Sequence, residues 1–259
     1  MQIETMHLKG YETKIILPSG YHEQYRYPVI YLHDGGNGAI QVLNQIEHLI
    51  QSKQIAPIIL VGVTPINRND DYTPWPADAM LPNQPQLGGK AALYLDTLVQ
   101  TIKPAIDTHF STNPLPEATT IAGCSFGGLV SFFASYYASE IFGNYIFLSA
   151  SFWYEHALDY LNGQTFTILE KRYQKPTVVR ANQRLFLYVG EIEGIYRQTN
   201  QKYMLDYNKK AFELLKNEGF DKKAMKLMTD PEGTHDAYYF AKYFLEALKW
   251  LFPSSEKQE

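Results

Sequence analysis

Gly123-Cys124-Ser125-Phe126-Gly127 is the stretch that decides the fold. A short β-type run, residues 119–122, precedes it, and an apolar segment with helical spacing, residues 128–137, follows it. The pattern G-x-S-x-G between a strand and a helix is typical of a nucleophile elbow. The backbone turns so sharply there that only glycine fits on both sides of the serine. The sequence therefore predicts Ser125 as a nucleophile presented at the start of a helix.

A cysteine stands directly before this serine. Because Cys124 is the only cysteine of the chain, it has no partner for an internal disulfide, and a reducing compartment is indicated. We expect it to be a small buried side chain inside the elbow rather than a second nucleophile.

The remaining elements follow from runs of apolar residues. Helices are expected at 40–51, 90–110, 202–218 and from about 237 to 251. Strands are expected at 2–8, 13–17, 27–32, 57–63, 119–122, 144–148, 184–189 and 224–228. Because strands alternate with helices, the sequence predicts an α/β protein with a mostly parallel sheet covered on both faces. The first two strands are candidates for an antiparallel edge.

A chain of 259 residues can bury one large core. No internal boundary is evident, so a single domain over 1–259 is expected. The weakly patterned stretch 155–183 is interpreted as an insertion or small cap over the site.

The bulk charge bears on possible partners. The formal net charge is −4 and no basic run occurs, which argues against a nucleic acid as the main partner. No apolar stretch is long enough to predict a membrane-spanning helix, and the first residues lack the pattern of a signal peptide. We therefore predict a cytoplasmic location, and the sequence leaves the oligomeric state open.

An acyl-transferring serine needs a general base. Only two of the seven histidines, His156 and His235, follow Ser125. His235 comes after the last predicted strand, where the order serine, acid, histidine places the base. We therefore predict His235 as the base. The earlier histidines are interpreted as surface or structural, except that His33 lies in the predicted oxyanion loop.

The base needs a carboxylate to orient it. Glu191 and Glu193 both follow the strand at 184–189, and Asp230 follows the last strand. All three lie between Ser125 and His235 in the chain, which is the order that this kind of triad requires of its acid. Glu193 is favoured, and the other two stay open.

The oxyanion hole should combine the N–H of Phe126 with an N–H from an earlier loop. The loop His33-Asp34-Gly35-Gly36 follows the strand at 27–32, and either Gly35 or Gly36 can supply that second donor. Asp34 is expected to shape the loop, with its carboxylate pointing away.

Aromatic and cationic side chains are candidates for the substrate wall. The irregular stretch 64–89 carries Arg68, Tyr72 and Trp75, and Trp153 and Tyr154 follow another strand. Such residues suit a flat or aromatic acyl group, although they equally suit the covered rim of a sheet. Arg68 would favour an anionic substrate. No phosphate-binding loop and no metal-ligand spacing is present, so no metal and no cofactor are expected.

Taken together, the motifs of the chain resemble the putative esterase family of the α/β-hydrolases, which includes enterochelin esterases, esterase D (S-formylglutathione hydrolase) and feruloyl esterases. The resemblance covers most of the chain and depends on 31–36, 67–74, 123–128, 149–153, Gly190-x-x-Glu193 and Gly233-Thr234-His235. It implies the α/β-hydrolase fold and a triad of Ser125, Glu193 and His235. A second glutamate at 191 departs from the pattern, and the family does not determine the substrate.

The sequence thus predicts a serine carboxylesterase that acts on a small-molecule ester through an acyl-enzyme. Alternatives are an acyltransferase with the same triad, a peptidase, and a non-catalytic binding protein of the α/β-hydrolase fold.

Overall fold

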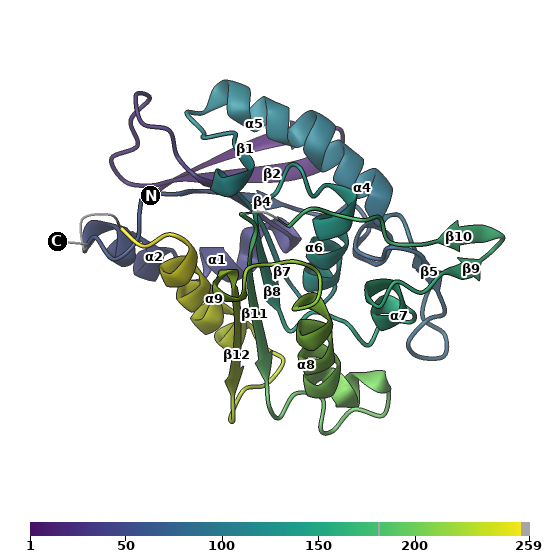
Figure 1. Cartoon of the computed structure of the whole chain (residues 1–259). Coiled ribbons are helices and arrows are strands. Elements are labelled where there is room, and N and C mark those ends of the chain that lie inside the picture. Colours follow the sequence, from purple (N-terminus) through teal and green to yellow (C-terminus); the bar gives the residue numbers. More distant parts are fainter. Residues whose placement is uncertain (181, 255–259) are drawn as a thin grey trace.

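The structure, a computed structural model, describes residues 1–180 and 182–254. Its centre is an eight-stranded sheet with the order β1-β2-β4-β3-β7-β8-β11-β12 (Figure 1). The strands are β1 (Gln2–Leu8), β2 (Tyr11–Leu17), β3 (Val29–Leu32), β4 (Ile59–Val63), β7 (Thr119–Cys124), β8 (Asn144–Leu148), β11 (Arg184–Gly190) and β12 (Met225–Asp230). All neighbours from β4 to β12 are parallel, whereas β1 and β2 form an antiparallel edge. The predicted mostly parallel α/β sheet is confirmed.

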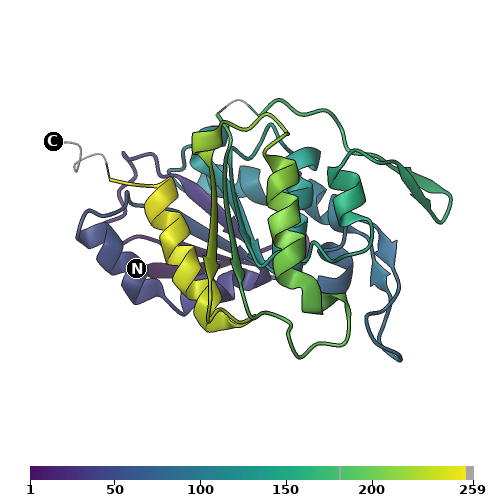
Figure 2. The same ribbon diagram turned by 60° about the horizontal axis from the view of Figure 1, so that its bottom comes forward.

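Helices cover both faces of this sheet (Figure 2). On one face lie α2 (Leu43–Gln51) and α9 (Ala237–Leu251), which bury Ile46 and Phe244 against the strands. The other face carries α4 (Ala91–Thr97), a π-helical turn (Leu98–Ile102), α5 (Lys103–His109), α6 (Phe126–Tyr137) and α8 (Met204–Leu215). Because both faces are covered, β3, β4 and β8 are buried along their whole length and consist mainly of apolar residues, as in other parallel sheets.

Short elements complete the chain. They are η1 (Asp34–Gly36), α1 (Asn37–Ile40), α3 (Arg68–Asp71), β5 (Pro76–Ala77), β6 (Leu87–Gly88), η3 (Pro116–Ala118), α7 (Ala157–Leu161), β9 (Phe166–Ile168), β10 (Lys171–Tyr173), η4 (Asn200–Tyr203) and η5 (Lys222–Ala224). Within the described ranges, no helix has both the length and the apolar composition that crossing a membrane requires.

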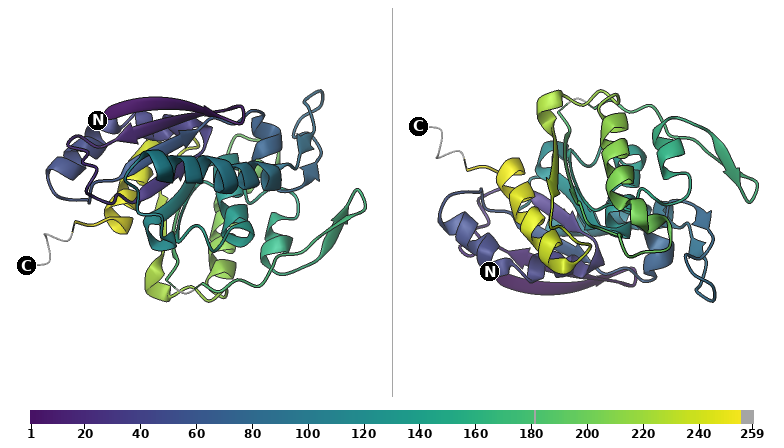
Figure 3. Two further views of the ribbon diagram at one scale, coloured as in Figure 1. Left: turned by 90° about the horizontal axis from the view of Figure 1, so that it is seen from above. Right: turned by 90° about the horizontal axis from the view of Figure 1, so that it is seen from below.

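The stretch 155–183 contains α7 and the β9–β10 hairpin, which extends from the body beside the β5–β6 segment (Figure 3). Phe166 and Tyr173 of the hairpin pack on Trp75, with ring centroids 4.8 and 5.7 Å away. No described residue of this stretch lines the cavity beside Ser125. Its apolar side chains pack on the loop 64–89 instead, and a cap over the site at 155–183 stays a prediction.

The loops that matter for chemistry meet at one edge of the sheet. Parallel strands present their carboxyl ends together, so the loops after β3, β7, β8, β11 and β12 converge. Most of the predicted site residues lie in these loops.

Candidate active site

Ser125 occupies a strained turn between β7 and α6. Its backbone angles are φ 57° and ψ −119°, a conformation that L-residues rarely adopt. The Ser125 N–H donates to Leu148 O at 3.0 Å, and the Ser125 carbonyl accepts from Leu129 N–H and Ser151 N–H. These bonds to β8 and to the loop after it hold the turn in place.

Glycine is required beside this turn for a steric reason. A Cβ built on Gly123 would lie 2.4 Å from the Gly127 carbonyl carbon, far inside van der Waals contact. The two glycines predicted from the motif therefore meet each other, and the backbone passes directly from strand to helix.

Glu193 and His235 come together across two loops. Glu193 Oε2 lies 2.8 Å from His235 Nδ1. The glutamate side chain is completely buried and that of the histidine is 28% exposed. The other carboxylate oxygen, Oε1, accepts hydrogen bonds from Gly190 N–H and from the hydroxyl of Ser149. The two bonds to Oε1 thus fix the carboxylate, and its other oxygen, Oε2, faces the imidazole of His235.

The two alternative acids have other partners. Glu191 Oε1 accepts a hydrogen bond of 2.6 Å from Thr229 Oγ1. Asp230 Oδ2 is bound by Lys242 Nζ at 2.7 Å and by the hydroxyl of Tyr243 at 2.8 Å. Of the three candidates, the geometry therefore favours Glu193 as the partner of His235.

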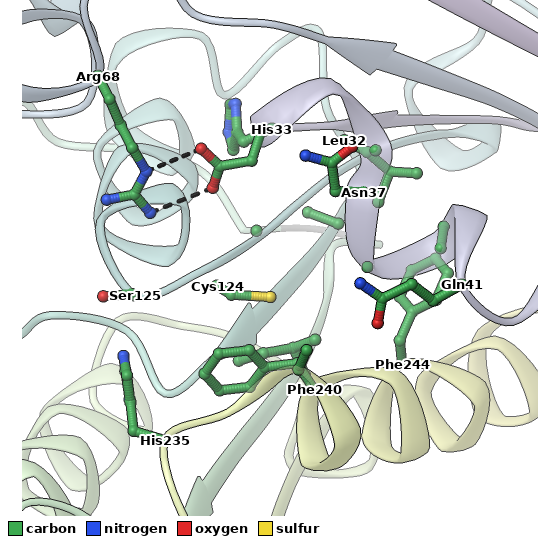
Figure 4. Close-up of a pocket in the computed structure, with 18 residues that line it drawn as sticks. Leu32, His33, Asn37, Gln41, Arg68, Cys124, Ser125, His235, Phe240 and Phe244 are labelled. Atoms are coloured by element: carbon green, nitrogen blue, oxygen red, sulfur yellow. Dashed lines mark hydrogen bonds and ion pairs between the residues drawn. The ribbon is translucent and has the colours of Figure 1, made fainter.

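Ser125 and His235 line the same cavity, which has a volume of about 320 Å³. Figure 4 shows the imidazole of His235 directed toward the end of the cavity where Ser125 lies. The Ser125 Oγ is 3.3 Å from the hydroxyl of Ser151, a buried residue of the loop after β8. In the sequence, Ser149 and Ser151 belong to the segment 149–153 that carries the family resemblance, and no role was predicted for them. Their place directly after a buried strand was the available signal.

The predicted oxyanion loop lies over the cavity. Gly36 lines it, whereas Gly35 packs on β4, where a Cβ added to Gly62 would lie 2.3 Å from Gly35 O. The Gly36 N–H closes the η1 turn on His33 O at 3.1 Å. Phe126 begins α6, and N–H groups in the first turn of a helix have no acceptor within it.

A charge pair lies at the Ser125 end of the cavity. Arg68 binds Asp34 through two parallel hydrogen bonds, Nε to Oδ1 at 2.8 Å and the terminal nitrogen to Oδ2 at 3.1 Å (Figure 4). Both residues line the cavity, so the expectation that the Asp34 carboxylate points away is wrong. Arg68 compensates its charge. The guanidinium also lies 5.6 Å from the centre of the Phe126 ring.

The predicted aromatic wall is mostly buried structure. Tyr72 and Trp75 are fully buried, and Tyr154 is nearly so. None of them, nor Trp153, lines the cavity beside Ser125. Tyr72 instead accepts a hydrogen bond from Asp34 N–H at 2.7 Å, and the Trp75 indole donates to Glu155 O at 2.8 Å. Trp153 and Tyr154 line a separate cavity of about 160 Å³.

His33 and Cys124 are neutral parts of the site. Burial, assisted by the positive charge of Arg68, lowers the pKa of His33 to about 3, and its Nδ1 lies 2.8 Å from the Tyr94 hydroxyl. Burial raises the pKa of Cys124 to about 12, so its thiol stays protonated at neutral pH. Its side chain nevertheless faces the cavity rather than the interior of the elbow (Figure 4).

The chain is similar to known proteins in both sequence and structure. The profile of the family described as "Putative esterase" matches residues 8–251. The uncharacterized protein YbbA of Bacillus subtilis (strain 168) is 30% identical over 226 residues, which cover 87% of this chain and 86% of YbbA.

Two solved structures show the same architecture. An IroE-like serine hydrolase from Shewanella oneidensis superposes with a TM-score of 0.77 at 25% identity, covering 97% of this chain and 80% of that protein. The enterobactin esterase FES from Shigella flexneri gives a TM-score of 0.73 at 19% identity and covers 97% of this chain and 59% of FES.

Proposed function

The chain belongs to the Putative esterase family and is a serine hydrolase that acts on esters, and we propose that it does so as a carboxylesterase with a triad of Ser125, Glu193 and His235. One observation carries the triad. A fully buried carboxylate binds Nδ1 of a histidine that shares a cavity with the serine of the elbow. This is the geometry that lets a serine lose its proton as it attacks.

The hydrogen bond to Glu193 determines how His235 acts. With Nδ1 donating to the carboxylate, Nε2 is the free nitrogen that accepts a proton from Ser125. Ser125 Oγ then bonds to the carbonyl carbon of the ester, and the negative charge of Glu193 stabilises the imidazolium that forms. His235 returns the proton to the leaving alcohol, and an acyl group remains on Ser125.

Water completes the reaction by the same route. His235 takes a proton from water, the hydroxide oxygen bonds to the acyl carbon, and Ser125 is released with its proton restored. In both halves the Phe126 N–H, at the start of α6, stabilises the oxyanion together with the Gly36 loop. Which N–H of that loop is the second donor stays open between Gly35 and Gly36, because Gly36 lines the cavity while its N–H donates to His33 O.

The substrate is a small-molecule ester. The name of the FES relative, enterobactin esterase, makes a siderophore ester one compound to include in a screen. The cytoplasmic location and the lack of a nucleic-acid partner, both expected from the sequence, stay predictions.

The test is hydrolysis of p-nitrophenyl esters by the wild-type protein and Ser125→Ala. We expect turnover that falls by at least a thousandfold in the variant, and labelling of the wild-type protein alone by a fluorophosphonate. Adding an alcohol as acceptor separates hydrolysis from acyl transfer, because an acyltransferase would form the new ester as its main product. Full activity of Ser125→Ala would refute the proposal.

A further inference from the structure

The cavity extends well beyond the catalytic side chains. From Ser125 and His235 at one end it passes Cys124 and reaches Asn37 and Gln41 at the other (Figure 4). Its walls are the short helix α1, the ends of β3, β7 and β8, and the first turns of α9. Apolar side chains predominate, among them Leu32, Ala39, Ala122, Leu148, Phe240 and Phe244.

Charge is confined to the Ser125 end. The lining residues there include Asp34 and Arg68, which neutralise each other in a pair with two hydrogen bonds. The far end presents only the uncharged amides of Asn37 and Gln41, both at exposed positions. An ionised group lodged among the apolar walls between the two ends would lose water without gaining a counter-charge, which is costly. The cavity therefore suits an uncharged group.

Its volume limits the length of that group. The cavity measures about 320 Å³. A methylene is close in size to a water molecule, which takes about 30 Å³ in the liquid, so roughly ten such groups fit. The ester group at Ser125 takes about three of these places, which leaves room for about six or seven carbons.

The position of His235 indicates which half of the ester enters. The leaving alcohol must remain beside His235 to receive its proton. His235 also borders a second cavity of only about 30 Å³, lined further by Glu193, Gly194, Arg197, Gln201 and Met204, through which the alcohol can depart. The apolar cavity runs from Ser125 past Cys124 and Gly36 toward Gln41, so the acyl half is assigned to it.

We propose, on the premise that Ser125 hydrolyses esters as described above, that this cavity is an acyl subsite selecting an uncharged, mainly apolar acyl group of about seven or eight carbons, the carbonyl carbon included. Phe240, Phe244 and the wall formed by α1 set the length. Recognition of a carboxylate by Arg68 is not part of this subsite, because Asp34 already occupies the guanidinium.

Two substrate comparisons test the proposal. p-Nitrophenyl esters from acetate to dodecanoate measure acyl length, and each buried methylene should raise kcat/KM about fourfold up to the capacity of the cavity. Hexanoate should therefore exceed acetate on the order of 100-fold, with a decline beyond octanoate. The mono-p-nitrophenyl ester of adipic acid has the same chain length as hexanoate but ends in a carboxylate. We expect at least a tenfold lower kcat/KM for it.

Gly38 allows the cavity to be filled without distorting the fold. It lines the cavity, and a Cβ added to it meets nothing within 4 Å. Gly38→Phe should lower the hexanoate-to-acetate ratio at least tenfold, and Gly38→Ala should lower it much less. Gln45→Phe makes a similar change at an exposed position of α2, outside the cavity, and should leave the ratio unchanged. Thermal melting checks that each variant is folded.

The outcomes separate this inference from the function that it assumes. Ester turnover with no length preference, or equal rates for the hexanoate and adipate esters, would overturn the acyl subsite alone. If Gly38→Phe altered the preference among acetate esters of longer alcohols and not among acyl chains, the cavity would hold the alcohol. No turnover together with no labelling by a small methylphosphonate probe would overturn both proposals.

Discussion

Replacing Glu193 by glutamine removes one charge and hardly changes the shape of the buried turn. The glutamine side chain has only one oxygen acceptor. Its amide nitrogen must therefore face either His235 or the Gly190 N–H and the Ser149 hydroxyl, which donate to Oε1 of the glutamate. One donor then meets another donor, and the imidazolium formed during attack loses its counter-charge.

The size of the effect follows from the geometry. Two unit charges 2.8 Å apart interact by about 6 kcal/mol at an effective dielectric constant of 20. That value sets an upper limit near four orders of magnitude in rate, at 1.36 kcal/mol per factor of ten. His235 is 28% exposed, so water screens part of the interaction. We expect kcat to fall by about 10² to 10⁴, with a much smaller change in KM.

The assay is steady-state hydrolysis of a p-nitrophenyl ester near pH 8. Glu191→Gln is the matched control, since the same change is made two residues away in a side chain that binds Thr229. Its kcat should change less than threefold. Melting temperatures verify that both variants fold.

Two results would refute the reasoning. A hundredfold loss in Glu191→Gln with little loss in Glu193→Gln would make Glu191 the acid. Nearly full activity in both variants would mean that His235 works without a carboxylate.

Three further predictions follow from neighbouring contacts. Ser149→Ala removes one donor to Glu193, so kcat should fall about tenfold at constant KM in steady-state kinetics. Arg68→Met leaves the negative charge of Asp34 without its counter-charge beside the developing oxyanion, so kcat/KM should fall about tenfold. Adding Asp34→Asn should restore most of the lost kcat/KM, and additive losses in the double variant would contradict this. His33 has a folded pKa near 3, below its unfolded value near 6.5, so only the unfolded chain gains its proton as pH falls between those values. Its contribution to the free energy of unfolding should drop by about 1.6 kcal/mol from pH 6.5 to pH 5, and His33→Gln should lack that slope in urea titrations.

Local patterns were sufficient to predict the sheet and the elbow. The parallel strands are short apolar runs, and the spacing of Gly123, Ser125 and Gly127 is itself the steric requirement of the turn. Even the helix expected over 90–110 forms, although a π-helical turn interrupts it at Leu98–Ile102. Such features depend on residues close together in the chain, so the sequence contains them directly.

Contacts between distant segments were not predictable in the same way. Glu191 and Glu193 occupy equivalent positions after β11. The Gly190 N–H and the hydroxyl of Ser149, which lies in the loop after β8, bind Glu193 and hold its carboxylate in the interior. Aromatic residues of the loop 64–89 were expected at the substrate mouth. Trp75 is instead buried under the β9–β10 hairpin, because apolar area is better removed from water there.

One wall of the cavity lies apart from the reacting groups in the chain, although β7 and α9 contribute to both. Glu193 and His235 lie in turns fastened to each other by backbone hydrogen bonds, such as Ile192 N–H to Gly233 O. Much of the opposite wall is α1, a four-residue helix outside the sheet. Selectivity and turnover are therefore separable traits. Natural drift or a directed-evolution library confined to residues 37–41 would sample new substrates on an unchanged reaction centre, and this one scaffold could be diversified as a set of matched biocatalysts.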